Sequence, residues 1–255
     1  MRQKFSNMFN ENADSSIYSF LSKHYDEFTQ NVDYISYAEF LNKKLKNIGG
    51  KLILDAGCGT ANISLLLRDY GYDLICVDAS EEMLSIADLK SGGGLLLLNQ
   101  SLKDLDLYGT VNAAISTLDT LNHLDCKSLD RFLARLSLFI NPNGVFIFDL
   151  NTEYKHKKIL GDNIFVLESE DTIILWQNKL LDNLDVKIKM DILSRQANNL
   201  YNRKSGILKE YYHSAENIDL LLSKHGFKII EFYDGENFEA LCETSERVII
   251  VSEKI

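Results

Sequence analysis

The sequence predicts an α/β fold: a Rossmann-like, doubly wound, mostly parallel sheet with an antiparallel final strand, and a small antiparallel sheet inserted into it. Two patterns predict this fold. Between residues 51 and 150, short apolar runs alternate with amphipathic stretches, which is typical of buried parallel strands covered by helices. After residue 150, apolar residues recur with a period near two, which is typical of antiparallel strands.

Residues 1–46 are predicted to form an N-terminal helical segment, with two helices between residues 15 and 46. Apolar residues recur there at helical spacing, as in the run from Ile17 to Leu21. The pair Gly49 and Gly50 is expected to end the second helix, because glycine readily adopts the left-handed conformation that closes helices.

Residues 47–152 are predicted to form the main sheet. The apolar runs LILDAG, DLICVD, LLLLN, AAIST and VFIFDL are its expected strands, and the stretches between them have helical spacing. The cluster NPNG at residues 141–144 is typical of a turn and is expected to lead into the fifth strand.

Residues 153–214 are predicted to form the inserted antiparallel sheet, with alternation of faces extending through Tyr211, Tyr212 and His213. Trp176 stands among apolar residues and is expected in the core of this sheet. Residues 215–255 are predicted to return to the main sheet: a helix over residues 215–226, closed by Gly226, precedes two final strands.

Composition limits the classes of function. The 255 residues carry 27 basic and 37 acidic side chains, a formal net charge of −10, so no overall basic field attracts a polyphosphate. We expect a small-molecule substrate and no nucleic acid. No apolar run is long enough to span a membrane or to serve as a signal peptide, so the expected location is the cytoplasm, with no membrane partner.

The four cysteines show no pattern of a metal site or of a disulfide framework. Cys58, Cys76, Cys126 and Cys242 are widely separated, and no histidine stands at ligand spacing from them. We therefore expect four buried thiols and no metal ion.

The strongest signal for function is the segment LILDAGCGTANIS at residues 52–64. A strand ends at Asp55, and a turn with Gly57 and Gly59 leads into a helix, so a ligand can approach the backbone and the free amides of the helix N-terminus. The next strand ends at Asp78, whose carboxylate can accept hydrogen bonds from ribose hydroxyls. Together the two strand ends predict a nucleoside-binding crevice.

A dinucleotide is not the favoured ligand of this crevice. Its fingerprint has a third glycine where this chain has Asn62, and Asp55 would repel a pyrophosphate. A zwitterion with an ammonium and a sulfonium group tolerates that carboxylate better. A nicotinamide-dependent oxidoreductase is therefore disfavoured, and a plain turn in which Asp55 only caps the helix is the alternative without a ligand.

These residues resemble the class I S-adenosylmethionine-dependent methyltransferases of the small-molecule type. LDAGCGTA is similar to the first motif of that family, LDxGCGTG, and VDASEEML looks like its second motif. ISTLDTLNHL and FINPNGVFIFDLN are similar to its fourth and fifth strands, while YDEFTQNVDY and the WQN segment resemble the subgroup related to amino-sugar N-methyltransferases. The resemblance implies an enzyme that uses S-adenosyl-L-methionine as its cofactor.

The resemblance also implies which residues bind the cofactor. The methionine pocket is expected to be shaped by Asp55, Ala56, Gly57 and Gly59, and the ribose to be bound by Asp78. The adenine is expected to lie against Ala79, Met83, Ser101 and Leu102, and the floor beneath the sulfonium to be closed by Ser116. Residues 1–46 are expected to form a helical lid that covers the cofactor with Tyr25 and Tyr34.

Three residues depart from the pattern of the family. Ala61 stands where the family has glycine, and we expect it to begin the helix without a positive φ. Ser101 and Asn112 each stand where aspartate is common. Because a hydroxyl is a weaker partner for the adenine amine than a carboxylate, Ser101 is expected to reduce cofactor affinity.

The leading hypothesis is methyl transfer to a small molecule through an amine or hydroxyl group. Asp119 and His123 follow the fourth strand and are the candidate catalytic residues, because an amine must be neutral when it attacks; ordinary loop residues are the alternative. The alternative function is a non-catalytic module that binds S-adenosylmethionine or a partner through a degenerate site. The sequence leaves open the acceptor and the oligomeric state.

Overall fold

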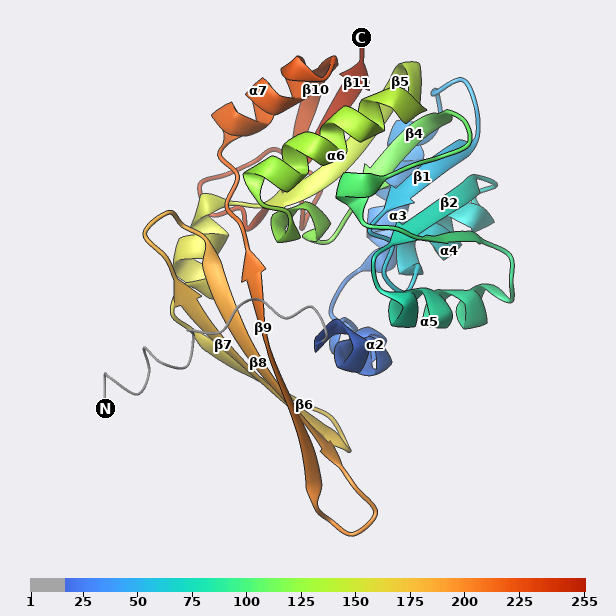
Figure 1. Cartoon of the computed structure of the whole chain (residues 1–255). Coiled ribbons are helices and arrows are strands. Elements are labelled where there is room, and N and C mark those ends of the chain that lie inside the picture. Colours follow the sequence, from blue (N-terminus) through green and yellow to red (C-terminus); the bar gives the residue numbers. More distant parts are fainter. Residues whose placement is uncertain (1–16) are drawn as a thin grey trace.

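The computed structural model describes residues 17–255 as a seven-stranded sheet covered by helices, with a separate four-stranded sheet extending away from it (Figure 1). In spatial order the strands of the large sheet are β10 (Phe227–Asp234), β11 (Arg247–Lys254), β5 (Ile140–Asn151), β4 (Val111–Ser116), β1 (Leu52–Ala56), β2 (Asp73–Asp78) and β3 (Leu96–Asn99). All neighbours from β5 to β3 pair in parallel, whereas β11 is antiparallel to both of its neighbours. The predicted mostly parallel sheet with an antiparallel final strand is confirmed.

Helices pack on both faces of the large sheet because its strands are apolar on both sides. On one face, α6 (Cys126–Phe139) and α7 (Ala215–Lys224) share a core with Phe146 and Phe148 of β5. On the other face, α3 (Tyr34–Leu45) and α4 (Asn62–Asp69) share a core with Ile147. Successive residues of one strand therefore serve opposite cores. The remaining helix of this layered unit, α5 (Glu81–Ser91), lies against β2 and β3.

The four-stranded sheet is fully antiparallel, as its period-two pattern predicts. Its strands are β6 (Ile164–Glu168), β7 (Thr172–Leu180), β8 (Val186–Arg195) and β9 (Tyr201–Glu210). The helix α2 (Ile17–Phe28) packs against β8 and β9, and a Cβ atom at Gly206 would lie 2.7 Å from Ile17. Trp176 packs edge-on against Phe165 beside the apolar core of this sheet. The inserted sheet thus supports one helix of the N-terminal segment.

The N-terminal segment is described only in part. Residues 1–16, which include the first two residues of the first predicted helix, lie outside the described residues. From residue 17 onward both predicted helices are present, as α2 and α3.

The turn predicted at residues 141–144 is a bulge within β5. The partner of Val111 in β4 is Ile140, but the partner of Ala113 is Val145, so the residues between them bulge out of the pairing. Asn143 adopts a φ of +62° there. A turn-forming cluster can therefore be absorbed into a strand when pairing resumes on its far side.

The alternation predicted through residues 211–213 is wrong, because β9 ends at Glu210. Beyond it, the backbone N–H of Tyr211 donates to the carbonyl oxygen of Asn122 at 2.7 Å, and the Asn122 side chain donates to the carbonyl oxygen of Tyr211 at 2.9 Å. Asn122 lies in the short helix η2 (Thr120–His123). The chain thus leaves the small sheet and is held directly against the loop that follows β4.

The prediction of four buried thiols is also wrong in part. Cys76 is buried and Cys58 is partly buried, but Cys126 and Cys242 are exposed, because one begins α6 and the other lies in the loop between β10 and β11. Within residues 17–255 no group of three or more His, Cys, Asp or Glu side chains is arranged to hold a metal ion. Over the same residues, no helix has the length and apolar character needed to cross a membrane.

Candidate functional site

The loop between β1 and α4 is a tight turn built on two glycines. Gly57 has a φ of +84°, and a Cβ atom there would lie 2.1 Å from Cγ2 of Thr120, in the loop after β4. Gly59 has a φ of +53° and open space around it. The backbone N–H groups of Gly57 and Cys58 both donate to the carbonyl oxygen of Val77. Glycine at position 57 therefore lets the two loops touch, whereas the sequence predicts the close approach of a ligand to this backbone.

Ala61 ends this loop with a φ of +63°, so the expectation that it begins α4 without a positive φ is wrong. Its N–H donates to the carbonyl oxygen of Cys58 at 2.9 Å, and its side chain is fully buried. The path of the chain into the helix requires a left-handed residue here whatever its side chain. For alanine that conformation costs about 1–2 kcal/mol.

Two carboxylates lie at the ends of β1 and β2, as predicted. Asp78 accepts hydrogen bonds from the backbone N–H groups of Gly59 (2.9 Å) and Ser80 (2.8 Å), and burial raises its pKa. Asp55 is buried and accepts a hydrogen bond from the hydroxyl of Ser64 at 2.5 Å, while its Oδ1 atom has no partner. Burial raises the pKa of Asp55 to about 7. The carboxylates of Asp55 and Asp78 therefore favour the approach of a cation or of a hydrogen-bond donor.

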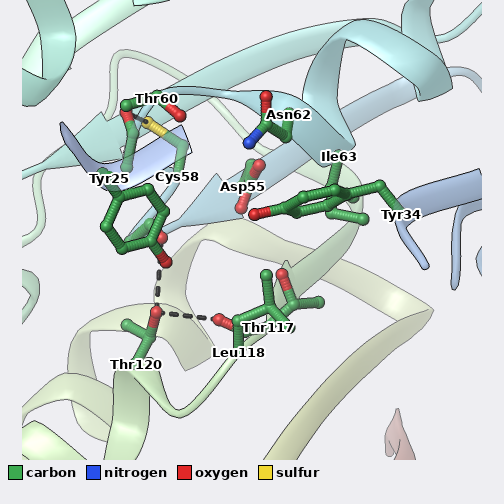
Figure 2. Close-up of a pocket in the computed structure, with 12 residues that line it drawn as sticks. Tyr25, Tyr34, Asp55, Cys58, Thr60, Asn62, Ile63, Thr117, Leu118 and Thr120 are labelled. Carbon is green, nitrogen blue, oxygen red and sulfur yellow. Dashed lines mark hydrogen bonds between the residues drawn. The ribbon is translucent and has the colours of Figure 1, made fainter. Parts of the chain in front are cut away.

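A cavity opens between the glycine loop, the loop after β4 and the N-terminal helices (Figure 2). It holds about 350 Å³ of empty space, open solvent included. Tyr25 from α2 and Tyr34 at the start of α3 lie on either side of Asp55 in this view. The wall consists of Tyr25, Tyr34, Asp55, Gly57, Cys58, Gly59, Thr60, Asn62, Ile63, Thr117, Leu118 and Thr120.

The other residues expected at the cofactor, Asp78 among them, do not line this cavity. Ala56 and Leu102 are buried in the core, and the buried hydroxyl of Ser116 donates to the carbonyl oxygen of Ala56 at 2.7 Å. Ala79 and Met83 lie before and within the first turn of α5, and Ser101 precedes the short helix η1 (Leu102–Asp104). Leu102 can therefore offer a ligand only its backbone.

The helix α2 is attached to the glycine loop by one carboxylate that sequence reasoning missed. Asp26 accepts hydrogen bonds from Thr60 (2.6 Å), Asn62 (2.9 Å) and Lys90 of α5 (2.8 Å). Partial burial opposes the charge, yet these donors hold the pKa of Asp26 below its usual value. Asn62, which replaces the third glycine of a dinucleotide fingerprint, thus contacts α2.

The loop after β4 carries both candidate catalytic residues. Asp119 forms an ion pair with Arg247 of β11, with 2.5 Å between Oδ1 and Nη2. Burial opposes its charge, but Arg247 and other neighbours keep the pKa of Asp119 below its usual value. His123 is exposed at the end of η2, close enough to interact electrostatically with Asp119 and with Glu210 of β9. The structure therefore brings Asp119 and His123 together.

Several further polar residues at this site were missed by sequence reasoning. Asp149 ends the apolar part of β5 as Asp55 and Asp78 end theirs, so the rule applied to those two strands would have found it. Glu210 and Arg247 gave no such signal, because each comes from an element outside the parallel strands and is placed only by the packing of the whole chain.

The chain matches the profile of a family described as "Methyltransferase domain" over residues 53–144. A putative methyltransferase of Geobacillus sp. (strain WCH70) is 27% identical over 238 residues, which cover 90% of this chain and 96% of the relative. The putative methyltransferase YqeM of Bacillus subtilis (strain 168) is 31% identical, over 64% of this chain and 66% of the relative.

Solved structures of methyltransferases have the same fold as this chain. An S-adenosylmethionine-dependent methyltransferase from Clostridium acetobutylicum ATCC 824 superimposes with a TM-score of 0.82 at 25% identity, covering 93% of this chain and 99% of that one. The sugar N-methyltransferase KedS8 from Streptoalloteichus sp. ATCC 53650 superimposes with a TM-score of 0.73 at 17% identity, covering 96% of this chain and 94% of that one.

Proposed function

Because the chain belongs to the S-adenosylmethionine-dependent methyltransferases, we propose that it transfers the methyl group of this cofactor to a small molecule that presents an amine. The predictions of a methyltransferase and of S-adenosylmethionine as the cofactor are confirmed, and the non-catalytic module and the oxidoreductase are set aside. The class of acceptor and the roles of individual residues are the proposal.

The residues around the cavity suit this cofactor. The unpartnered Oδ1 atom of Asp55 is a buried hydrogen-bond acceptor at the cavity wall, suited to the ammonium group of the methionine moiety. Asp78 would hold the ribose, and the glycine loop would approach the methionine moiety closely. Bound there, the cofactor supplies an electrophilic methyl group on a sulfonium.

The remaining roles follow the same arrangement. Tyr25 and Tyr34 would cover the cofactor. Ala79, Met83, Ser101 and the backbone of Leu102 would meet the adenine, and Ala56 and Ser116 would form the floor through the hydrogen bond between them. The protein then has mainly to align the acceptor and to exclude water.

The observation that carries the choice of an amine is a buried group of hydrogen-bond acceptors beside the loop after β4. Glu210 is buried and receives a hydrogen bond from Nδ2 of Asn151 at 2.8 Å. The Oδ1 atom of Asn151 has no partner, although the residue is buried. Burial, and then the charge of Asp119, raise the pKa of Glu210. A ligand that brings hydrogen-bond donors and positive charge satisfies this group best.

Different carboxylates would serve different steps. Asp119, held charged by Arg247, would attract the protonated amine and orient it. Glu210, whose pKa is raised, would take the proton so that the nitrogen attacks as a neutral amine. His123 is exposed beside both carboxylates and would pass the proton to solvent.

An acceptor screen tests this proposal. The purified protein and S-adenosylmethionine are incubated with small amines, amino sugars among them, and with matched alcohols, and the demethylated cofactor is measured. We expect turnover on amines, and a kcat at least about a hundredfold lower for Glu210→Gln, the scale of a lost proton acceptor. Glu168→Gln, which changes an exposed carboxylate of β6, is the matched control and should leave kcat unchanged. Turnover on alcohols alone, or an unchanged kcat for Glu210→Gln, would contradict the proposal.

A further inference from the structure

Asp149 is buried at the end of β5 and does not line the cofactor cavity, yet its carboxylate collects four hydrogen bonds. We propose that Asp149 is a positioning residue, which holds the loop at residues 117–120 in the conformation that forms one wall of the cofactor cavity. This inference concerns cofactor binding and is independent of the acceptor.

The four donors to Asp149 come from three separate parts of the chain. The backbone N–H groups of Leu118 and Asp119 donate at 2.6 and 2.8 Å. The hydroxyl of Tyr37 in α3 donates at 2.6 Å, and Nη1 of Arg247 in β11 donates at 3.1 Å. Because the side chain is fully buried, these bonds replace all of its contact with water.

The loop that Asp149 holds is strained. Leu118 and Asp119 are adjacent non-glycine residues with φ values of +58° and +68°. Such residues rarely adopt this left-handed region, and the surrounding structure must compensate for the cost. Their two N–H groups converge on one anion, as successive backbone amides do in turns that bind anions. Here the anion is the side chain of Asp149.

The loop in turn shapes both functional parts of the site. Thr117, Leu118 and Thr120 line the cofactor cavity, and Thr120 packs against Gly57. Figure 2 shows Thr117, Leu118 and Thr120 facing Tyr25 and Asp55 across the cavity. Without the carboxylate at position 149, we expect Leu118 to return to an ordinary backbone conformation. The wall of the cavity would then shift, although no cofactor-lining side chain has changed.

A measurement on the unaltered protein tests the first part of this inference. Hydrogen exchange followed by NMR should find the amides of Leu118 and Asp119 protected as strongly as those of β4, although both lie in a loop. Exchange of either amide at the rate of an exposed loop would overturn the inference.

The second test measures the affinity for S-adenosylmethionine by calorimetry in Asp149→Asn. Asparagine has nearly the same shape as aspartate. Its NH₂ group is itself a donor, so it cannot accept the hydrogen bonds that the surrounding N–H and O–H groups give to Asp149. We expect affinity to fall at least about tenfold, which corresponds to about 1.4 kcal/mol. The matched control is Asp191→Asn, because Asp191 is also a buried carboxylate, bonded to Arg203 and Ser205 in the four-stranded sheet. The control should lose stability but keep its cofactor affinity. Equal affinities in the two variants would refute the inference.

A third variant separates positioning from general loss of structure. Glycine adopts positive φ without strain, so Leu118→Gly removes the cost that Asp149 offsets. Asp149→Asn should therefore weaken cofactor binding less in the Leu118→Gly background than in the natural sequence. An undiminished effect would mean that Asp149 does not act through this loop.

Discussion

Gly57→Ala tests whether the contact between the glycine loop and the loop after β4 requires glycine. A Cβ atom at position 57 would lie 2.1 Å from Cγ2 and 2.8 Å from Oγ1 of Thr120. The φ of +84° adds backbone strain, since alanine rarely adopts that region. The substitution thus creates two separate costs, and neighbouring positions allow them to be measured one at a time.

Each cost has a typical size. Left-handed backbone costs an alanine about 1–2 kcal/mol. Forcing a methyl group into a filled space costs about a further 1–3 kcal/mol. Gly57→Ala should therefore reduce the free energy of unfolding by about 2–5 kcal/mol. Gly59→Ala should reduce it by only about 1–2 kcal/mol, because a Cβ atom there meets nothing within 4 Å.

Urea denaturation of the two variants, with calorimetry of S-adenosylmethionine binding, is the assay. Combining Gly57→Ala with Thr120→Ala removes the atoms at 2.1 and 2.8 Å. In that background only the Cβ atom of residue 120 stays close, at 3.0 Å, so the cost of Gly57→Ala should fall most of the way toward that of Gly59→Ala. Equal costs for Gly57→Ala and Gly59→Ala in the natural sequence would refute this account of the loop.

Two further predictions concern other carboxylates of the site. Because the folded protein raises the pKa of Asp55 from 3.8 to about 7, it retains a proton that the unfolded chain loses between those values. This residue should therefore lower the free energy of unfolding by up to about 1.4 kcal/mol per pH unit as pH rises through that window. Urea titrations should show that Asp55→Asn removes this decline; parallel pH profiles would contradict it. Asp26→Asn should weaken the attachment of α2 to Thr60 and Lys90, and lower cofactor affinity about fivefold, which corresponds to about 1 kcal/mol. Since the folded protein lowers the pKa of Asp26, the attachment is fully present at any pH above the usual pKa of aspartate. It is lost only when the pH falls through the lowered pKa. Stopped-flow release of S-adenosylmethionine at an unchanged rate would contradict the role of Asp26.

The main sheet was predictable because its signals are local. Short apolar runs mark β1 to β5, and Asp55 and Asp78 mark the two strand ends at the glycine loop. Backbone conformation beyond those signals was not predictable. The positive φ of Ala61 depends on how the turn meets α4, and the end of β9 at Glu210 depends on the bonds between Tyr211 and Asn122.

The polar network around the loop after β4 was predictable only in part. Asp119 and His123 follow a parallel strand, where ligands bind in such sheets, so position along the chain was enough to choose them. The charged groups near them come from distant elements: Arg247, which pairs with Asp119, lies in the last strand, and Glu210 lies in the inserted sheet. Their roles depend on tertiary packing, which one sequence does not encode in any short pattern.

The most direct test of the central claim is calorimetric titration with S-adenosylmethionine, its demethylated product and NAD in parallel, repeated with Asp78→Ala. The account predicts binding of the first two ligands and not of NAD. It also predicts a loss of at least about tenfold in affinity for Asp78→Ala, because hydrogen bonds to a partly buried carboxylate are lost. Binding of NAD in preference to S-adenosylmethionine, or full affinity in a folded Asp78→Ala variant, would contradict it.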